Sequence, residues 1–368
     1  MAEPNPNFWN GKNVLITGIT GFVGSWMSEI LTKEPFHANV YGLIRRQSNP
    51  KMENIESLLK NNKIKLIRGD LHDIGSIVNA LKESKADIVF HLASQSFVPH
   101  SFASPNDTYL TNVIGTLNIL EAIKIVDKNI LMHFAGSSEE YGLVIADDDH
   151  YRRMLSQYKI IHPAPQFDET GKVIPEIPVK ETNPLRTVGT SPYGSSKRIA
   201  EDACRTYVSC YGMKVYTTRG FNHTGPRRGR EFVTNEITRQ IAEAIKHGKK
   251  DLVLGNLTSI RDFSDVRDVI RGYLLVIEHG RPGEVYNLCS GKGRSIRELA
   301  DLAIKIAKED FGLDHDLEFK EDLSRLRPTD LPLLIGDYSK AKRELGWEPK
   351  ITFEQTLRDM ISWQLQHV

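Results

Sequence analysis

The sequence is poor in cysteine and has no long apolar run, and each shortage excludes a class of protein. Three cysteines occur in 368 residues, and none belongs to a CxxC pair. This odd number is typical of a reducing compartment, where we expect Cys204, Cys210 and Cys289 to pack as small apolar side chains. No stretch approaches the roughly 20 apolar residues that a membrane-spanning helix needs, and the first dozen residues lack the apolar run of a signal peptide. We therefore expect a soluble, cytoplasmic protein with no membrane partner.

The sequence also lacks an excess of either charge. It has 48 basic and 47 acidic side chains, which gives a net charge of +1. This balance argues against binding to nucleic acid, so any phosphate must be held by a local group of cations. Hydrophobic residues make up 40% of the chain and charged residues 26%, as in ordinary globular proteins with a buried core. We expect no nucleic-acid partner and no metal ion.

Short apolar strands alternate with amphipathic helices through the first half of the chain. This alternation indicates right-handed βαβ units and an α/β fold with a doubly wound parallel (Rossmann) sheet. The expected strands cover residues 12–17, 39–44, 64–69, 87–92, 129–135 and 214–219, and the expected helices cover residues 24–31, 74–82, 116–126 and 193–211.

The pattern divides the chain into two parts. Residues 1–220 are predicted to form the dinucleotide-binding domain, and residues 221–368 mainly a smaller mixed α/β lobe that binds substrate. Helices are expected at 234–247 and 266–279, and a strand near 285–289 returns to the first domain.

Two local features refine this division. Ser295 and Glu298 have the spacing of a capping box at the start of a helix. Residues 144–190 are proline-rich and charged, without a clear period. We interpret them as an insertion over the mouth of the active site, with one short helix near 151–158.

A GxxGxxG motif follows the first predicted strand and opens the first helix. Its residues Gly18, Gly21 and Gly24 permit a tight turn and close approach of a pyrophosphate, which the amides at a helix N-terminus stabilise. In this position the motif predicts a dinucleotide site. The other residues expected around the cofactor are Thr20, Phe22, Val23, Asp70, Leu71, Leu92 and Ala93.

The second strand indicates which dinucleotide is bound. It ends in Arg45 and Arg46, and no acidic residue lies between Val40 and Pro50. An acidic residue near this position binds the ribose 2′-hydroxyl of NAD, whereas arginine accommodates the 2′-phosphate of NADP. The sequence therefore favours NADP.

A tyrosine and a lysine are spaced to lie on one helix face. Tyr193 and Lys197 are four residues apart, and a nearby ammonium lowers the pKa of a phenol. Such a phenol can exchange protons with a sugar hydroxyl near neutral pH.

Three polar residues follow the fifth strand, at the edge where open α/β sheets bind ligands. They are Ser137, Ser138 and Glu139. There Ser137 and Ser138 are expected to contact the sugar and Glu139 to act as an acid or base.

The glycine motif, the serine after a strand and the YxxxK pair occur in the order of a known family. The chain resembles an extended short-chain dehydrogenase/reductase of the nucleotide-sugar epimerase/dehydratase branch, from Lys12 to about Gly346. Within that branch it is most similar to the GDP-mannose 4,6-dehydratases and the GDP-6-deoxy-4-keto-hexose reductases. The segments that carry the resemblance are GITGFVG, LASQSFVPHSF, GSSEEYG, SPYGSSK, RGFNHTGPRRG, GNLTSIRDFSDVRD, LRPTDLPLLIGD and KAKRELGW.

The resemblance implies a reaction. Ser137, Tyr193 and Lys197 would flank the C4 hydroxyl of a hexose, and Tyr193 would remove its proton while NADP+ accepts hydride from C4. Glu139 would assist loss of water across C5 and C6, and hydride return to C6 would convert GDP-mannose to GDP-4-keto-6-deoxymannose. Dehydratases usually carry threonine at the position of Ser137. A GDP-4-keto-6-deoxy-sugar reductase, a nucleotide-sugar 4-epimerase and a non-catalytic NADP-binding sensor remain as alternatives.

The resemblance also implies how the substrate diphosphate is held. Arginine binds phosphate through two parallel N–H groups, and Arg261 and Arg327 match family positions with this role. Asn222 matches an asparagine that contacts the diphosphate, and Arg228 is a further expected contact. Because relatives form dimers and tetramers, we expect a homodimer or homotetramer.

Overall fold

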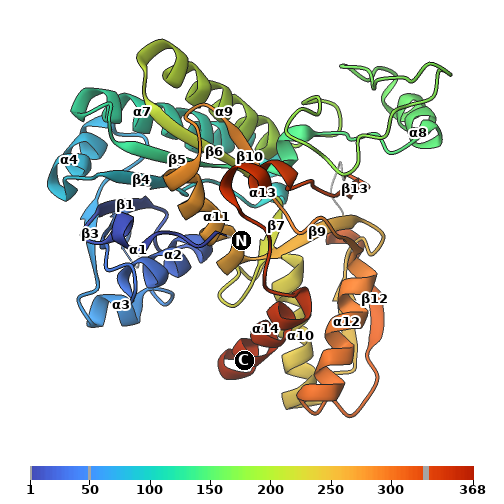
Figure 1. Ribbon diagram of the computed structural model, residues 1–368. Helices are drawn as coiled ribbons and strands as arrows, with labels where there is room; N and C mark the ends of the chain where they lie inside the picture. Colours follow the sequence, from blue (N-terminus) through green and yellow to red (C-terminus); the bar gives the residue numbers. More distant parts are fainter. Residues whose placement is uncertain (1, 49–50, 326–330) are drawn as a thin grey trace.

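The computed structural model describes residues 2–48, 51–325 and 331–368, and its centre is a seven-stranded parallel sheet (Figure 1). The strand order is β10-β6-β5-β4-β1-β2-β3. This order reverses between β1 and β4, which is the switch point at which doubly wound sheets bind ligands. The predicted Rossmann-type sheet is thereby confirmed, including the returning strand. Its members are β1 (Asn13–Thr17), β2 (Asn39–Ile44), β3 (Ile64–Arg68), β4 (Ile88–His91), β5 (Leu131–Ser137), β6 (Lys214–Gly220) and β10 (Val285–Leu288).

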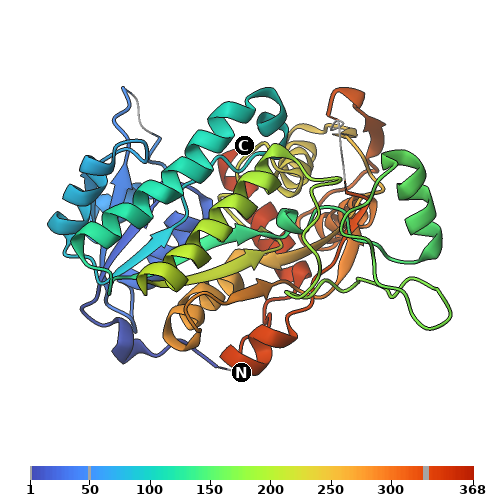
Figure 2. The ribbon, with the colours of Figure 1, turned by 90° about the horizontal axis from the view of Figure 1, so that it is seen from above.

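Helices cover both faces of this sheet. One face carries α4 (Ile74–Ser84), α7 (Gly115–Val126) and α9 (Pro192–Tyr211), and Figure 2 shows α7 and α9 side by side across it. The other face carries α2 (Phe22–Thr32) and α11 (Val266–His279), with α13 (Ser339–Leu345) packed against α11 and β10. Shorter elements of this part are α1 (Pro6–Trp9), α3 (Glu56–Lys60) and α5 (Val98–Ala103).

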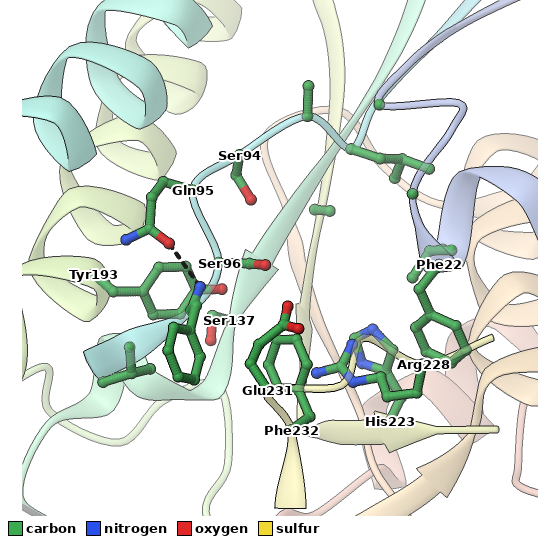
Figure 3. Close-up of a pocket in the computed structure, with 18 of the residues that line it drawn as sticks. Phe22, Ser94, Gln95, Ser96, Ser137, Tyr193, His223, Arg228, Glu231 and Phe232 are labelled. Atoms are coloured by element: carbon green, nitrogen blue, oxygen red, sulfur yellow. Dashed lines mark hydrogen bonds between the residues drawn. The ribbon is translucent and has the colours of Figure 1, made fainter. Parts of the chain in front are cut away.

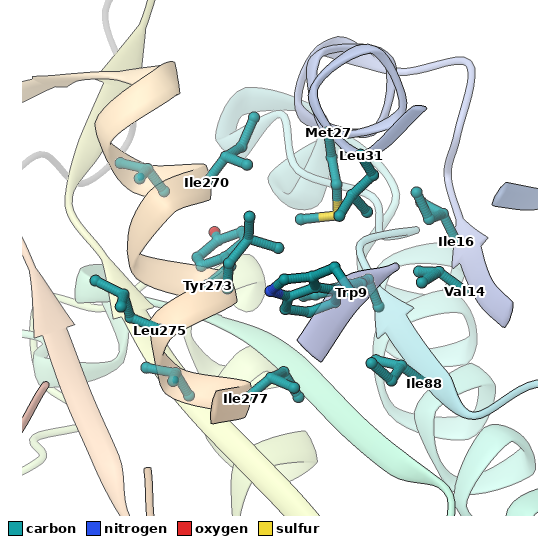
Figure 4. Close-up of a cluster of buried hydrophobic side chains, with 14 of the residues drawn as sticks. Trp9, Val14, Ile16, Met27, Leu31, Ile88, Ile270, Tyr273, Leu275 and Ile277 are labelled. Atoms are coloured by element: carbon teal, nitrogen blue, oxygen red, sulfur yellow. The ribbon is translucent and has the colours of Figure 1, made fainter. Parts of the chain in front are cut away.

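The two cores follow from the alternation of side chains along the strands. In β1, Val14 and Ile16 face α2 and α11, whereas Leu15 lies in the core beneath α4 and α7. This period of two is what a strand buried on both faces requires. Trp9 fills the first core beside Ile88 and Leu31 (Figure 4) and is fully buried.

The cysteines follow the sequence prediction in two cases of three. Cys204 and Cys289 are buried, whereas Cys210 is exposed. The prediction for Cys210 is wrong because the last turn of α9 presents this residue to solvent.

One helical run is longer than the helix expected at 116–126. It extends from Pro105 to Val126 through α6 (Pro105–Tyr109) and the π-helical turn η1 (Leu110–Ile114) into α7. By length and composition alone this run could cross a membrane, which differs from the expectation that the chain has no run of that kind. Ile119, Leu120 and Ile123 are fully buried against the sheet, so this apolar face is part of the core.

The second lobe combines helices with two small sheets. Helices α10 (Val233–His247), α12 (Ile296–Asp310) and α14 (Phe353–His367) share one apolar core with the parallel pair β8 (Asp251–Leu254) and β12 (Glu318–Glu321). Strand β9 (Ile260–Asp265) pairs with β7 (Asn222–Thr224), β11 (Gly293–Ser295) and β13 (Leu333–Leu334). The 3-10 turn η3 (Leu323–Arg325) completes the lobe.

The chain crosses between the two lobes several times. Helices α11 and α13 come from the second half of the sequence but pack on the central sheet. The boundary at residue 220 therefore stays a prediction. The capping box is confirmed: the Glu298 amide donates to Ser295 Oγ at 3.1 Å, and the Ser295 amide donates to Glu298 Oε2 at 2.7 Å.

The insertion at 144–190 has a small core of its own. It contains α8 (Asp148–Tyr158) and projects from the side of the molecule (Figure 1, green). Arg186 is 1% exposed and donates to both carboxylate oxygens of Glu176 at 2.6 Å. Its Nε also donates to the Pro163 carbonyl at 2.7 Å. The insertion is thus held by internal contacts.

Candidate active site

A cavity of about 1380 Å³ runs from the loop after β1 to β9 of the second lobe. It lies at the carboxyl ends of the parallel strands, as expected for an open α/β sheet. Figure 3 shows Tyr193 and Ser137 on one side of it and Phe22, Arg228 and His223 on the other.

The glycine-rich loop forms one end of the cavity and leaves no room for side chains. Gly18 has φ +75°, and a Cβ there would lie 2.9 Å from the Ala93 nitrogen. A Cβ on Gly24 would lie 2.4 Å from the Gly18 oxygen. Gly21 caps α2 without a side-chain hydrogen bond. This backbone fits a dinucleotide pyrophosphate. The predicted residues that line this part are Gly18, Thr20, Gly21, Phe22, Val23, Gly24, Leu92 and Ala93.

A threonine ties this loop to the neighbouring strand. Thr17 Oγ1 accepts hydrogen bonds from the amides of Leu92 at 3.2 Å and Ala93 at 3.1 Å. It also lies 2.9 Å from His91 Nδ1. The two strand ends at the switch point are therefore held at a fixed separation.

Most residues predicted for the far end of the dinucleotide also lie at the cavity. Arg45, Asp70 and Leu71 line it, whereas Arg46 does not. Both arginines are exposed at the end of β2. Arg46 differs from the prediction because neighbouring side chains of an extended segment point in opposite directions.

The predicted catalytic pair, Tyr193 and Lys197, is presented by the first two turns of α9. Ser191 caps this helix by accepting a hydrogen bond from the Gly194 amide at 3.1 Å, and Pro192 occupies the first helical position. A Cβ on Gly194 would lie 2.6 Å from the Glu139 oxygen. Because α9 packs this closely on the turn after β5, Tyr193 reaches Ser137.

Burial changes the pKa of both members of the pair. It raises the pKa of Tyr193 to about 12, opposed mainly by a hydrogen bond with Ser137. Burial lowers the pKa of Lys197 to about 8. The predicted lowering of the phenol pKa by Lys197 is not among the main causes. The Lys197 amine instead donates to the Ala135 carbonyl at 2.7 Å.

The turn η2 (Ser138–Tyr141) separates the residues predicted after β5 into two sets. Ser137 and Glu139 line the cavity. Ser138 is 2% exposed and does not line it, so its prediction as a substrate contact is wrong. In this tight turn the side chain of Ser138 is directed into the protein.

The residues predicted for the substrate diphosphate line the side of the cavity formed by β7, β9 and the segment after β7. They are Asn222, Arg228 and Arg261, whereas Arg327 lies outside the described residues. The Arg228 guanidinium lies 3.5 Å from the ring centre of Phe232 and 5.0 Å from that of Phe22. Burial lowers the pKa of Arg228 to about 10. Arg228 thus lies between the glycine-rich loop and the second lobe.

An asparagine that the sequence pattern does not single out links these parts. Asn112, in η1, accepts a hydrogen bond from the Gln95 amide at 2.8 Å and donates to Ser196 Oγ at 2.9 Å. It joins the loop after β4 to the helix that carries Tyr193 and Lys197, and π-helical turns occur frequently at functional sites. A single asparagine within an apolar helical pattern gives no sequence signal for this role.

The insertion does not cover this site. Among the described residues that line the cavity, none belongs to 144–190. The prediction that the insertion lies over the mouth is wrong, because its apolar side chains pack on one another and beside β13. Among the same described residues, no group of three or more histidine, cysteine or acidic side chains is placed to hold a metal.

Comparison with known proteins gives the family of the chain. A family model described as the NAD dependent epimerase/dehydratase family matches residues 14–289. The GDP-mannose 4,6-dehydratase of Yersinia enterocolitica is 32% identical over 96% of this chain and 94% of its own length. The human GDP-mannose 4,6 dehydratase is 30% identical over 95% of this chain and 91% of its own length.

Solved structures include the same fold with a bound dinucleotide. RMD from Pseudomonas aeruginosa, complexed with NADPH, is 29% identical and has a TM-score of 0.70. The match covers 97% of this chain and 100% of that chain. By its family match and its full-length relatives, this chain belongs to the NAD-dependent epimerase/dehydratase family.

Proposed function

We propose that this protein is a GDP-mannose 4,6-dehydratase, an enzyme that forms GDP-4-keto-6-deoxymannose and water. The observation that carries the proposal is the convergence of Ser137, Glu139, Tyr193 and Lys197 in one cavity with the glycine-rich loop. The relatives that carry this name in bacteria, insects, mammals and plants support it.

Each side chain has a role that follows from its place. Tyr193 takes the proton of the sugar C4 hydroxyl, and the Ser137 hydroxyl holds the same oxygen. Lys197 in its protonated form stabilises the phenolate of Tyr193. Glu139 assists the loss of water across C5 and C6. A bound dinucleotide supplies reversible hydride acceptance, so no net oxidation occurs.

NADP is our proposal for the dinucleotide. Arg45 lines the cavity at the end of β2, where arginine accommodates a 2′-phosphate. The NADPH in RMD from Pseudomonas aeruginosa supports this choice.

The substrate diphosphate is proposed to lie on the side of the cavity formed by β7, β9 and the segment after β7. Arg228 and Arg261 supply the positive charge and Asn222 an amide. Arg327 stays part of this proposal through the family resemblance alone. These side chains hold the nucleotide so that its hexose reaches Tyr193.

The decisive experiment is incubation of the purified protein with GDP-mannose and catalytic NADP. The expected product has a methyl group at C6 in place of the hydroxymethyl group, visible by NMR and as loss of one water by mass. Stoichiometric NADPH use with a supplied keto sugar would identify a reductase. A product with oxygenated C6 would identify an epimerase. No turnover of any nucleotide sugar would favour the non-catalytic sensor.

We also propose that the protein works as a homodimer or homotetramer in the cytoplasm. Large apolar side chains are exposed on the helices that cover one face of the sheet, which supports self-association. They are Leu110, Ile114, Ile125, Ile199 and Tyr211.

A further inference from the structure

A buried group of two carboxylates and one guanidinium lies directly behind the catalytic turn. Glu140, Glu201 and Arg219 are each 1% exposed. They belong to η2, α9 and β6, and so join the segment of Ser137 to the helix of Tyr193. A charged group buried this deeply is costly unless it is paired and hydrogen-bonded.

Arg219 donates hydrogen bonds to only one of the two carboxylates, Glu201, and makes a longer ion pair with Glu140. Its Nε and Nη2 donate to Glu201 at 2.9 Å and 2.6 Å, which is a two-pronged ion pair. Glu201 also lies 3.1 Å from Arg205. The nearest cation to Glu140 Oε2 is Arg219 Nε at 3.5 Å, beyond a good charge-assisted hydrogen bond.

Glu140 therefore has one satisfied oxygen and one unsatisfied oxygen. Oε1 accepts the Ser137 amide at 2.6 Å. Oε2 is buried and, as an acceptor, has no hydrogen-bond partner. A proton on Oε2 would turn it into a donor toward Glu201 and remove the repulsion between two buried anions.

We propose that Glu140 is a positioning residue for the proposed reaction and that it acts as an uncharged carboxyl group. Its carbonyl oxygen accepts the Ser137 amide, and its hydroxyl donates to Glu201. These two bonds fix the turn that carries Ser137 and Glu139 against the helix that carries the catalytic pair. Burial and the charge of Glu201 raise the pKa of Glu140 well above its ordinary value, in agreement with this state.

The absence of charge on Glu140 matters for Lys197, one helical turn before Glu201. An ionised Glu140 would stabilise the ammonium and compete for it with the phenolate of Tyr193. A neutral Glu140 leaves the phenolate as the preferred partner of Lys197. The titratable and charged groups that face Glu140 are Arg219, Tyr193, Lys197, Glu201 and Cys204.

The space around Glu140 Oε1 supports this arrangement. A Cβ on Gly136 would lie 2.7 Å from that oxygen and 2.7 Å from the Thr218 carbonyl. Glycine at 136 therefore leaves room for the carboxyl group behind the cavity.

Two substitutions separate the roles of the hydrogen bonds and of the charge. Glu140→Gln keeps an acceptor for Ser137 and a donor for Glu201, so kcat should stay within about threefold of the original, since both bonds persist. Glu140→Leu removes both, and kcat should fall by about 10-fold to 100-fold with KM changed less than twofold, because transition-state placement is lost. The pH profiles of Glu140→Gln and the unaltered enzyme should coincide from pH 6 to pH 9.

Three outcomes would each overturn the proposal. They are an equal loss of rate in Glu140→Gln and Glu140→Leu, a pH profile of Glu140→Gln that differs from that of the unaltered enzyme, and an unchanged kcat in Glu140→Leu.

Infrared spectroscopy tests the protonation state of Glu140 without any substrate. The difference spectrum between the unaltered protein and Glu140→Gln at neutral pH should contain the C=O stretch of one protonated carboxylic acid. Its absence from this spectrum would also overturn the proposal. Because this measurement needs neither folding of the leucine variant nor turnover of GDP-mannose, failure of the proposed function stays distinguishable.

Discussion

At the residue scale, burial favours the uncharged forms of both side chains proposed to take part in proton transfer, Tyr193 and Lys197. It raises the pKa of Tyr193 to about 12 and lowers that of Lys197 to about 8. A phenol and an amine that are both neutral cannot stabilise each other. The charge on Lys197 is therefore the quantity on which phenolate formation depends.

Replacement of Tyr193 by phenylalanine tests the proton acceptor. Tyr193→Phe should lower kcat by about 100-fold to 10,000-fold, the usual contribution of general acid–base catalysis. Affinity for the dinucleotide, measured by fluorescence titration, should be nearly unchanged because the glycine-rich loop is not altered. Tyr211→Phe is the control, since Tyr211 is 46% exposed at the far end of α9. A near-normal rate in Tyr193→Phe would exclude this tyrosine as the proton acceptor.

The pKa of Lys197 predicts the alkaline limb of the pH profile. The pKa of about 8 includes the attraction of an ionised Glu140, and an uncharged Glu140 lowers it further, so kcat/KM should already be falling by pH 8. At pH 9 at most about a tenth of the amine remains charged, and the rate should fall in proportion. Lys197→Arg keeps its charge in this range and should give a level profile even if its rate is lower. A constant kcat/KM for the unaltered enzyme from pH 7 to pH 9 would contradict the prediction.

Substitution of Arg45 and, as a control, of Arg46 tests whether the protein prefers NADP to NAD. Arg45 lines the cavity and its neighbour does not. Removal of a charge-assisted hydrogen bond costs about 1.5–3 kcal/mol. Arg45→Ala should therefore weaken NADP binding by about 10-fold to 100-fold and leave NAD binding unchanged. Calorimetric titration of both variants with both dinucleotides measures this. Equal losses in Arg45→Ala and Arg46→Ala would indicate a general charge effect.

At the element scale, the packing of α2 against the glycine-rich loop determines the dinucleotide site. A Cβ on Gly24 would lie 2.4 Å from the Gly18 oxygen and 2.8 Å from Ile19 Cα. Both atoms belong to the backbone, so neither can move aside as a flexible side chain would. Gly75, in the first turn of α4, offers a comparison because the nearest atom to its Cβ would be Asp73 Oδ1 at 3.4 Å.

Alanine at these two positions should have opposite effects. Gly24→Ala should lower the free energy of unfolding by about 1–3 kcal/mol through overpacking and abolish dinucleotide binding at concentrations that saturate the unaltered protein. Gly75→Ala should raise the free energy of unfolding by about 0.5–1 kcal/mol because alanine favours helix. Urea denaturation measures both values. If Gly24→Ala bound the dinucleotide normally, close backbone approach at this loop would not be required.

The positions of some helices and strands could be predicted from the sequence, and those of others could not. Regular alternation identified the strands of the central sheet, and the YxxxK spacing identified the first turns of α9. Short strands such as β7 and β13 gave no pattern because two or three residues contain no period. The positions of Asn112 and Glu140 depend on contacts between segments far apart in the chain. The insertion at 144–190 packs on its own core and does not cover the cavity, and its proline-rich sequence has no period that would predict this core.

At the scale of the whole molecule, one face of the central sheet is covered by helices that remain partly apolar on their outer side. Ile125 is 59% exposed and Ile114 is 41% exposed. They are eleven residues apart, or about three helical turns, and lie on the same face. Lys124 lies over the ring of Tyr211 at 4.4 Å, which brings the end of α9 beside the end of α7. A second copy of the chain would bury this surface.

A charged residue in this surface should separate the copies. We expect sedimentation equilibrium to give a multiple of the 41.7 kDa chain mass for the unaltered protein and a single chain for Ile125→Glu, since desolvation of a carboxylate opposes association. Ile160→Glu is the control, because Ile160 is 72% exposed on the insertion and should leave the mass unchanged. The central sheet is complete within one chain, so Ile125→Glu should remain folded by circular dichroism. An unaltered protein with the mass of one chain, or equal dissociation by both variants, would show that this face is not the interface.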